Sequence, residues 1–236
     1  MPTDLGSFST PDFRLRAARC AHPLPCASVA AAPATASSPS VTDIAADAAP
    51  IRVRGDHDLN PDICTAFLSA ENLRPAAVLI PVADRGTHMN VILTKRSPDM
   101  PAHAGQIALP GGTMTAGDAS AVDTALRETH EEIGIAPEFI TPLGLLDTYC
   151  TRTGFRIVPV LAIVQEGFTL TLDEREVAEV FEVPLAHLMT EANFQHHEKE
   201  IHGKVRYFYA IPYKNYYIWG ATAGILRSMY ERLYAE

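Results

Sequence analysis

The chain has 236 residues, 47% of them hydrophobic and 20% charged, which is typical of a folded protein with one sizeable core. It carries 28 acidic and 19 basic residues, a formal net charge of −9, and this argues against a general nucleic-acid-binding protein, which would need a basic surface. No apolar run reaches the ~18–20 residues of a membrane span, so we expect no membrane partner. The four cysteines lack the paired spacing of a zinc site, which indicates reduced thiols in a cytoplasmic protein.

The N-terminal part of the chain differs in composition from the rest. Residues 27–40 contain only Ala, Pro, Ser, Thr and Val, a composition that favours a flexible segment. Residues 12–19 could form a short basic helix that docks on the folded part. We therefore predict a low-complexity, flexible N-terminal extension over residues 1–50 and one folded domain over residues 51–236.

The remainder alternates apolar runs with helical patterns. Residues 76–82 and 90–94 predict a hairpin of buried strands, and residues 106–109 a short strand before a glycine turn and a helix. Pro159 suggests that its strand lies at an edge or carries a bulge, and His196 lies in a polar stretch that we interpret as a connection. The order predicts an α/β protein with a mixed sheet. Its later elements are strands at 143–146, 156–164, 179–183, 205–211 and 216–219, a short helix at 184–189 and a terminal helix from about residue 221.

The most informative stretch is the glycine turn at residues 109–118 and the helix that ends near residue 135. At ~100° per residue, Glu128, Glu131 and Glu132 share one face of this helix. Their mutual repulsion would be relieved by a divalent cation, and oxygen donors suit Mg²⁺ or Mn²⁺. The alternative is a solvated acidic face in which Arg127 pairs with Glu131. Another face is apolar and can pack on a core; it carries Val122, Ala125, Leu126 and Ile133.

This stretch resembles the Nudix box, G-x5-E-x7-R-E-U-x-E-E-x-G-U, in which U is aliphatic. Three departures occur: Asp118 stands at the first glutamate, one extra residue follows it, and Thr129 replaces the first aliphatic residue. The resemblance implies the Nudix α/β/α sandwich (α+β) with a mixed sheet, and a metal-dependent hydrolase. It also implies that the three glutamates and the carbonyl of Gly112 bind the metal. The residues in register are Gly112, Arg127, Glu128, Glu131, Glu132, Gly134 and Ile135.

The residues before the box resemble the signature of the coenzyme A pyrophosphatase subfamily, L-L-T-x-R-[SA]-x3-R-x3-G-x3-F-P-G-G. Pro101 and Leu109 stand where that signature has Arg and Phe. The resemblance implies cleavage of coenzyme A or acyl-CoA to 3′,5′-ADP and (acyl-)4′-phosphopantetheine. The alternatives are another nucleoside diphosphate derivative, such as ADP-ribose, NADH or a nucleoside triphosphate, or a Nudix-fold module that binds a nucleotide without cleaving it. The matching residues are Thr94, Arg96, Ser97, Gly105, Pro110, Gly111 and Gly112.

Roles follow for individual residues. Glu128, Glu131 and Glu132 are the catalytic metal ligands, and Arg127 more plausibly orients them than touches substrate, because its donors suit carboxylates. Glu176 is our choice for the general base, with Glu174 and Glu179 as alternatives. An exposed acidic loop would explain these three equally well. The tyrosines near residue 207 and Trp219 could stack on an adenine or serve packing alone, and the sequence leaves a homodimer open. Candidate substrate contacts are Lys95, Arg96, Gly105, Gly111, Gly112 and Arg156.

Overall fold

The structure is a computed structural model that describes residues 8–24, 52–61, 73–201 and 203–235. Within these ranges, nine strands form a mixed sheet whose main order is β1-β7-β8-β2-β3-β4. β5 also pairs with β2, β6 with β8 and β9 with β3. The strands are β1 (Val53–Gly55), β2 (Arg74–Asp84), β3 (Met89–Arg96), β4 (Ile107–Ala108), β5 (Gly111–Thr113), β6 (Ile140–Leu145), β7 (Thr148–Cys150), β8 (Phe155–Val164) and β9 (Val177–Pro184).

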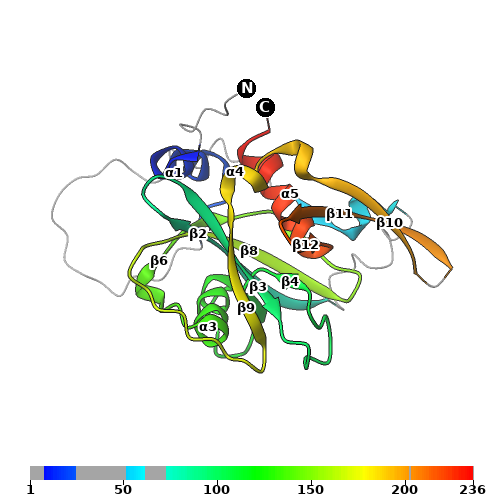
Figure 1. Ribbon diagram of the computed structural model, residues 1–236, viewed down its shortest axis with the longest axis horizontal. Coiled ribbons are helices and arrows are strands. Elements are labelled where there is room, and N and C mark those ends of the chain that lie inside the picture. Colours follow the sequence, from blue (N-terminus) through cyan, green and yellow to red (C-terminus); the bar gives the residue numbers. More distant parts are fainter. Residues whose placement is uncertain (1–7, 25–51, 62–72, 202, 236) are drawn as a thin grey trace.

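A smaller sheet follows, in the order β10-β11-β12, and both of its strand pairs are antiparallel. Its strands are β10 (Gln195–Ile201), β11 (Lys204–Tyr213) and β12 (Tyr216–Trp219). The β10–β11 hairpin projects from the body of the molecule (Figure 1). The polar stretch that we interpreted as a connection is therefore largely strand β10. The α-helices of the described part are α1 (Thr10–Cys20), α3 (Ala121–Ile133), α4 (Leu185–Leu188) and α5 (Ala221–Leu233).

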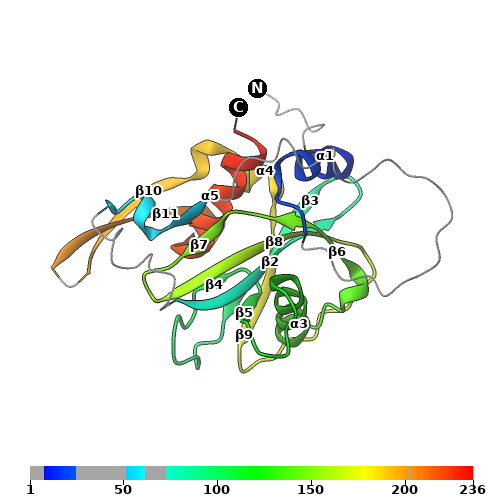
Figure 2. The same cartoon turned by 180° about the vertical axis from the view of Figure 1, so that it is seen from behind.

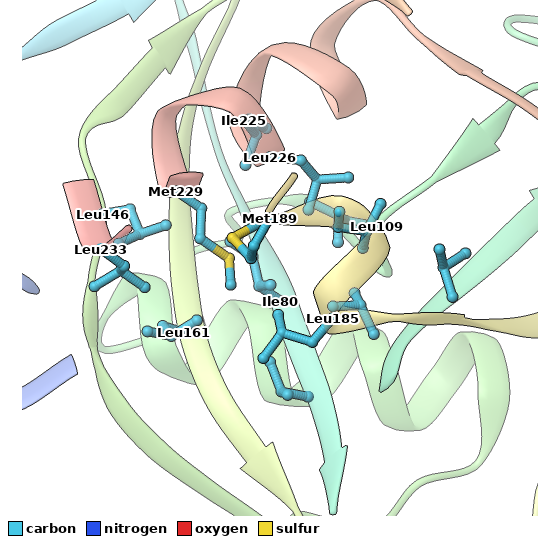
Figure 3. Close-up of a cluster of buried hydrophobic side chains, with 14 of the residues drawn as sticks. Ile80, Leu109, Leu146, Leu161, Leu185, Met189, Ile225, Leu226, Met229 and Leu233 are labelled. Carbon is cyan, nitrogen blue, oxygen red and sulfur yellow. The ribbon is translucent and has the colours of Figure 1, made fainter. Parts of the chain in front are cut away.

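The main sheet separates two hydrophobic cores, because successive side chains of a strand point to opposite faces. Ala77 and Leu79 of β2 face α3, whereas Ile80 and Val82 face α1, α4 and α5. Figures 1 and 2 show α3 on one side of the sheet and α5 on the other, and Figure 3 shows α5 side chains meeting those of the strands. This is the expected α/β/α sandwich, so the predicted α/β class with a mixed sheet is confirmed.

Helix α1 belongs to this folded unit. Its Phe13 and Ala17 are 0% and 1% exposed, and Nη1 of Arg16 donates a hydrogen bond to the carbonyl of Leu233 (3.0 Å). The extension predicted for residues 1–50 therefore includes a helix docked on α5, and residues 25–50 lie outside the described residues. Among the described helices, none is long and apolar enough to cross a membrane.

Candidate active site

Helix α3 begins and ends at residues suited to those positions. The hydroxyl of Ser120 accepts a hydrogen bond from the backbone N–H of Asp123, and Gly134 ends the helix with φ of 77°. Ala125 and Ile133 are both fully buried against the sheet. The caps and the buried face fix the rotation of the helix and hence the direction in which each glutamate leaves it.

The two glycines of β5 allow the chain to pass very close to its neighbours. A Cβ atom on Gly112 would lie 2.5 Å from the Cδ atom of Glu128. A Cβ atom on Gly111 would lie 2.4 Å from the carbonyl oxygen of Ala77, and its φ of +150° also favours glycine. The backbone N–H of Gly111 donates to Oε2 of Glu132 (3.1 Å). The glycine pair therefore places backbone polar groups directly beside two carboxylates.

Two glutamates of α3 have raised pKa values. Glu132 is 5% exposed, and burial raises its pKa to about 8, against the lowering effects of the Gly111 N–H and of Arg96. Burial likewise raises the pKa of Glu128, although Arg127 opposes the shift. The charge of Glu176 raises both pKa values further. Two carboxyl groups with raised pKa values thus lie beside a third carboxylate, an arrangement found at functional sites.

Arg127 braces the outer side of this group. Its Nε and Nη2 donate to the two carboxylate oxygens of Asp118, at 2.8 and 2.9 Å. Its Nη1 lies 2.9 Å from Oε1 of Glu128 and donates to Oε2 of Glu131 (2.8 Å). The Arg127 hydrogen bonds hold the pKa of Asp118 well below its usual range. Asp118, which replaces the first glutamate of the box, is therefore joined to the glutamates through Arg127.

A cavity of about 660 Å³ opens over the carboxylates. The structure brings six of the predicted site residues to its wall, namely Arg96, Gly111, Gly112, Glu128, Glu132 and Glu176. Five others are not among the residues that line it: Lys95, Gly105, Arg127, Glu131 and Arg156. Sequence reasoning missed several lining residues. The sequence offered a signal only near residue 208, where an aromatic run follows Arg206. The missed residues are Asp56, Asn60, Arg152, Phe155, Arg206 and Phe208.

The role predicted for Glu131 as a metal ligand stays a prediction. The Glu131 side chain is 57% exposed and pairs with Arg127, as the alternative interpretation held. In the parts of the chain that the structure describes, no three His, Cys, Asp or Glu side chains form a group that could hold a metal ion. The donor chemistry nevertheless fits a hard divalent cation, because Glu128, Glu132 and Glu176 offer oxygen ligands whose repulsion a cation would relieve. Gly112 also leaves room for its backbone beside Glu128.

Comparisons with known proteins agree with this geometry. The family model of the NUDIX domain matches residues 73–203. This chain belongs to the Nudix family. It is 39% identical over 158 residues to a protein of Enterobacter sp. (strain 638) named uncharacterized Nudix hydrolase NudL, covering 67% of this chain and 82% of that protein. A protein of the same name from Klebsiella pneumoniae (strain 342) is 38% identical over 188 residues, covering 74% of this chain and 95% of the relative.

Solved structures are more distant. An Ap4A hydrolase of C. elegans is 22% identical, with a TM-score of 0.40, and the match covers 47% of this chain and 80% of that one. Such a score adds nothing to the assignment, which rests on the family match and the relatives. Nudix hydrolases are pyrophosphohydrolases that generally use divalent metal ions, and this chain shares their domain. The predicted Nudix resemblance is thus confirmed.

Proposed function

We propose that this Nudix hydrolase cleaves the pyrophosphate of coenzyme A or an acyl-CoA, with Mg²⁺ or Mn²⁺, to 3′,5′-ADP and (acyl-)4′-phosphopantetheine. The observation that supports this substrate most directly concerns Arg96, the arginine of the subfamily signature. It lines the cavity, and its charge acts on buried Glu132. Its Nε atom is buried and has no hydrogen-bond partner among the described residues. A phosphoryl oxygen of the substrate would supply that partner.

The chain's own residues suit hydrolysis of a phosphoanhydride. Glu128 and Glu132 would hold the metal with the Gly112 carbonyl, and a bound metal polarises phosphoryl oxygens and lowers the pKa of water. Glu176, at the same cavity, would take the proton of the attacking water as its oxygen bonds to phosphorus and the bridging P–O bond breaks. Arg127 orients Glu128 from outside the cavity and does not touch the substrate.

The departure at Pro101 does not open a gap in the cavity wall. Pro101 is exposed and is not among the residues that line the cavity. The cavity instead has cations at Arg96, Arg152 and Arg206, which can neutralise a polyanionic substrate. The unpaired thiols of Cys20 and Cys150 support a cytoplasmic location as part of the same proposal.

Product analysis by HPLC tests the proposal. CoA, acetyl-CoA, ADP-ribose, NADH and a nucleoside triphosphate are each incubated with the enzyme and Mg²⁺ or Mn²⁺. We expect 3′,5′-ADP to form from the CoA species at the highest kcat/KM. If ADP-ribose, NADH or the triphosphate is cleaved faster, that compound, and not CoA, is the preferred substrate. Absence of all cleavage would favour a nucleotide-binding module.

A further inference from the structure

The cavity has two walls that come from different parts of the chain. The carboxylates, the glycine pair and Arg96 all lie within residues 73–203, which match the Nudix domain. A second wall comes largely from residues outside that match. Helix α3 and the β10–β12 sheet, which supply the two walls, lie well apart in both ribbon views (Figures 1 and 2). The second wall includes Asp56, Asn60, Arg206, Phe208, Trp219 and Ile225.

Aromatic and cationic side chains share this second wall. The rings of Phe208 and Trp219 meet edge to face, with centroids 5.3 Å apart and planes at 62°. Arg206 precedes Phe208 on β11, Trp219 ends β12, and Arg152 comes from the turn between β7 and β8. The guanidinium of Arg152 makes no hydrogen bond or ion pair with any described residue, and the residue is exposed. The first wall therefore concentrates carboxylates, and the second combines aromatic rings with two arginines.

Hydrogen bonds of buried Asn60 and half-buried Asp56 hold the second wall in place. Asn60, 4% exposed, exchanges two hydrogen bonds of 2.9 Å with the backbone of Tyr207. The carboxylate of Asp56 accepts one hydrogen bond from the hydroxyl of Tyr149 and another from the backbone N–H of Arg152. Because these groups are engaged within the protein, they position the wall. What remains for a ligand is the aromatic pair and the Arg152 guanidinium.

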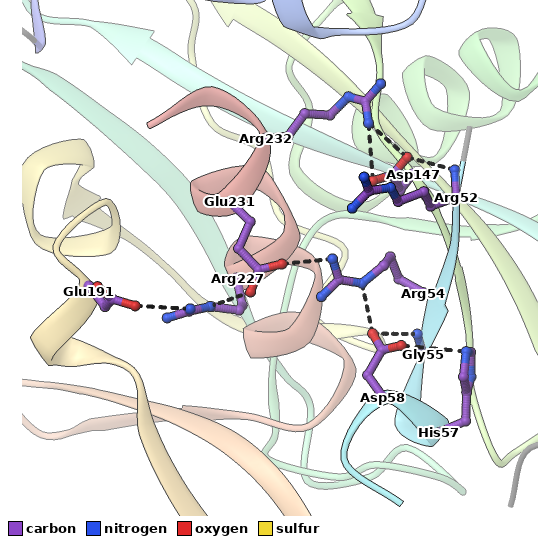
Figure 4. A network of polar contacts seen from close by, with 10 residues as sticks. All are labelled: Arg52, Arg54, Gly55, His57, Asp58, Asp147, Glu191, Arg227, Glu231 and Arg232. Atoms are coloured by element: carbon purple, nitrogen blue, oxygen red, sulfur yellow. Dashed lines mark hydrogen bonds and ion pairs between the residues drawn. The ribbon is translucent and has the colours of Figure 1, made fainter. Parts of the chain in front are cut away.

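An ionic network extends this support (Figure 4). Arg54, next to the Asp56 segment, donates from Nε to Asp58 and from Nη1 to Glu231 of α5, both at 2.7 Å. Arg227 of α5 donates to the other oxygen of Glu231, also at 2.7 Å. The network fastens the segment around residue 56 to helix α5, whose first turn lines the cavity. The two halves of the second wall are thus held as one unit.

We propose that the second wall binds a nucleoside that carries a phosphate on its ribose. The flat base packs against Trp219 and Phe208, and the ribose phosphate pairs with Arg152. This inference rests on the proposed function, which supplies a substrate with such a group on one side of its pyrophosphate. The other arm of that substrate is neutral and flexible, so it offers a guanidinium no anionic group to pair with. Base–aromatic stacking and Arg–phosphate pairing are the interactions that match the wall.

The chain carries its own reporter for this test, because Trp219 is the single tryptophan of the sequence. The full-length protein with Mg²⁺ is titrated with 3′,5′-ADP, 5′-AMP or 4′-phosphopantetheine, none of which has an anhydride bond to cleave. Tryptophan fluorescence and calorimetry follow binding. We expect both nucleotides to quench the fluorescence and 3′,5′-ADP to bind about tenfold more tightly than 5′-AMP. Quenching by 4′-phosphopantetheine alone would overturn the proposal.

Variants separate the two contacts. Trp219→Leu should weaken the binding of 3′,5′-ADP by about tenfold or more, as measured by calorimetry. Arg152→Gln should remove the preference for 3′,5′-ADP over 5′-AMP and leave the affinity for 5′-AMP unchanged. Matched controls are Tyr217→Leu on the same strand and Lys204→Gln on the exposed hairpin, neither of which lines the cavity. They should bind like the wild type, and far-UV circular dichroism checks that every variant is folded.

The outcome is independent of the product analysis. If CoA is cleaved but 3′,5′-ADP and 5′-AMP bind equally, the proposed function stands and the second-wall proposal falls. If CoA is not cleaved but the preference for 3′,5′-ADP is present and depends on Arg152, the second-wall proposal stands and the proposed function falls. Unaltered 3′,5′-ADP affinity in a folded Trp219→Leu variant also overturns the assignment of the base.

Discussion

Glu132 should make the metal-free protein sensitive to pH, and Glu132→Gln should remove that sensitivity. Burial raises the pKa of this carboxyl to about 8 from its ordinary 4.5. Because the folded state holds the proton more tightly, the contribution of this group to stability is greatest below about pH 4.5, falls as the pH rises and levels off above about pH 8. At about 1.4 kcal/mol per pH unit, ionisation lowers the free energy of unfolding by up to about 5 kcal/mol at pH 9 and about 3 kcal/mol at pH 7.

Urea unfolding in EDTA at pH 5, 7 and 9 measures this effect. Glutamine keeps an oxygen that can accept from the Gly111 N–H, so Glu132→Gln should match the wild type at pH 5 and exceed it by several kcal/mol at pH 9. Mg²⁺ should stabilise the wild type at pH 9 much more than the variant, and the variant should lack hydrolysis. The control, Glu131→Gln, alters an exposed side chain and keeps Glu132, so its stability should follow the same pH dependence as that of the wild type. An equal difference between the wild type and Glu132→Gln at pH 5 and pH 9 would refute the reasoning.

Three further predictions concern other parts of the structure. Gly112→Ala should reduce kcat about tenfold or more with little change in melting temperature, because its Cβ would displace the Glu128 carboxylate. Phe13→Ala should cost about 3–5 kcal/mol of unfolding free energy in urea titrations, because its fully buried ring joins α1 to the core. Arg232→Gln should cost about 3 kcal/mol in the same titrations, because Asp147, whose side chain is 4% exposed, loses its buried guanidinium partner.

Each of these has a control in the chain. Gly117→Ala places a Cβ no closer than 3.8 Å to another residue and should preserve kcat. Leu15→Ala alters a side chain of α1 that is 57% exposed, and Arg175→Gln removes an arginine whose side chain is 88% exposed. Both should change the unfolding free energy by less than about 0.5 kcal/mol. A Phe13→Ala or Arg232→Gln variant as stable as its control would contradict the packing of α1 or the buried ion pair of Asp147.

Helix α3 shows how far the sequence could define the site. Periodicity correctly placed the glutamates on one side and the apolar residues on another, since both depend only on ~100° per residue. Glu131 and Glu132 nevertheless differ by that same angle. The sheet covers Glu132 and leaves Glu131 in solvent beside Arg127. Which glutamate is buried depends on how the sheet packs against the helix, and the local sequence pattern does not predict that packing.

Pro159 illustrates a second limit. Its missing N–H suggested an edge strand or a bulge, yet β8 is central, with β2 on one side and β6 and β7 on the other. The proline is tolerated because it lies opposite the break between those two short strands. Its carbonyl still accepts a hydrogen bond from the N–H of Leu146 (3.0 Å). The predicted edge position is therefore wrong, and the irregularity beside Pro159 is the break between the neighbouring strands β6 and β7.

The second wall of the cavity could not be predicted, because it assembles from segments far apart in the chain. Arg54 reaches Glu231 across 177 positions, and Asn60 reaches the Tyr207 backbone across 147. Neither pair leaves a local pattern, whereas the box is contiguous and therefore visible. The separation also has a functional consequence. The catalytic groups are fixed by α3 and β5, and the second wall by its own polar network, so changes in that wall should alter KM more than kcat.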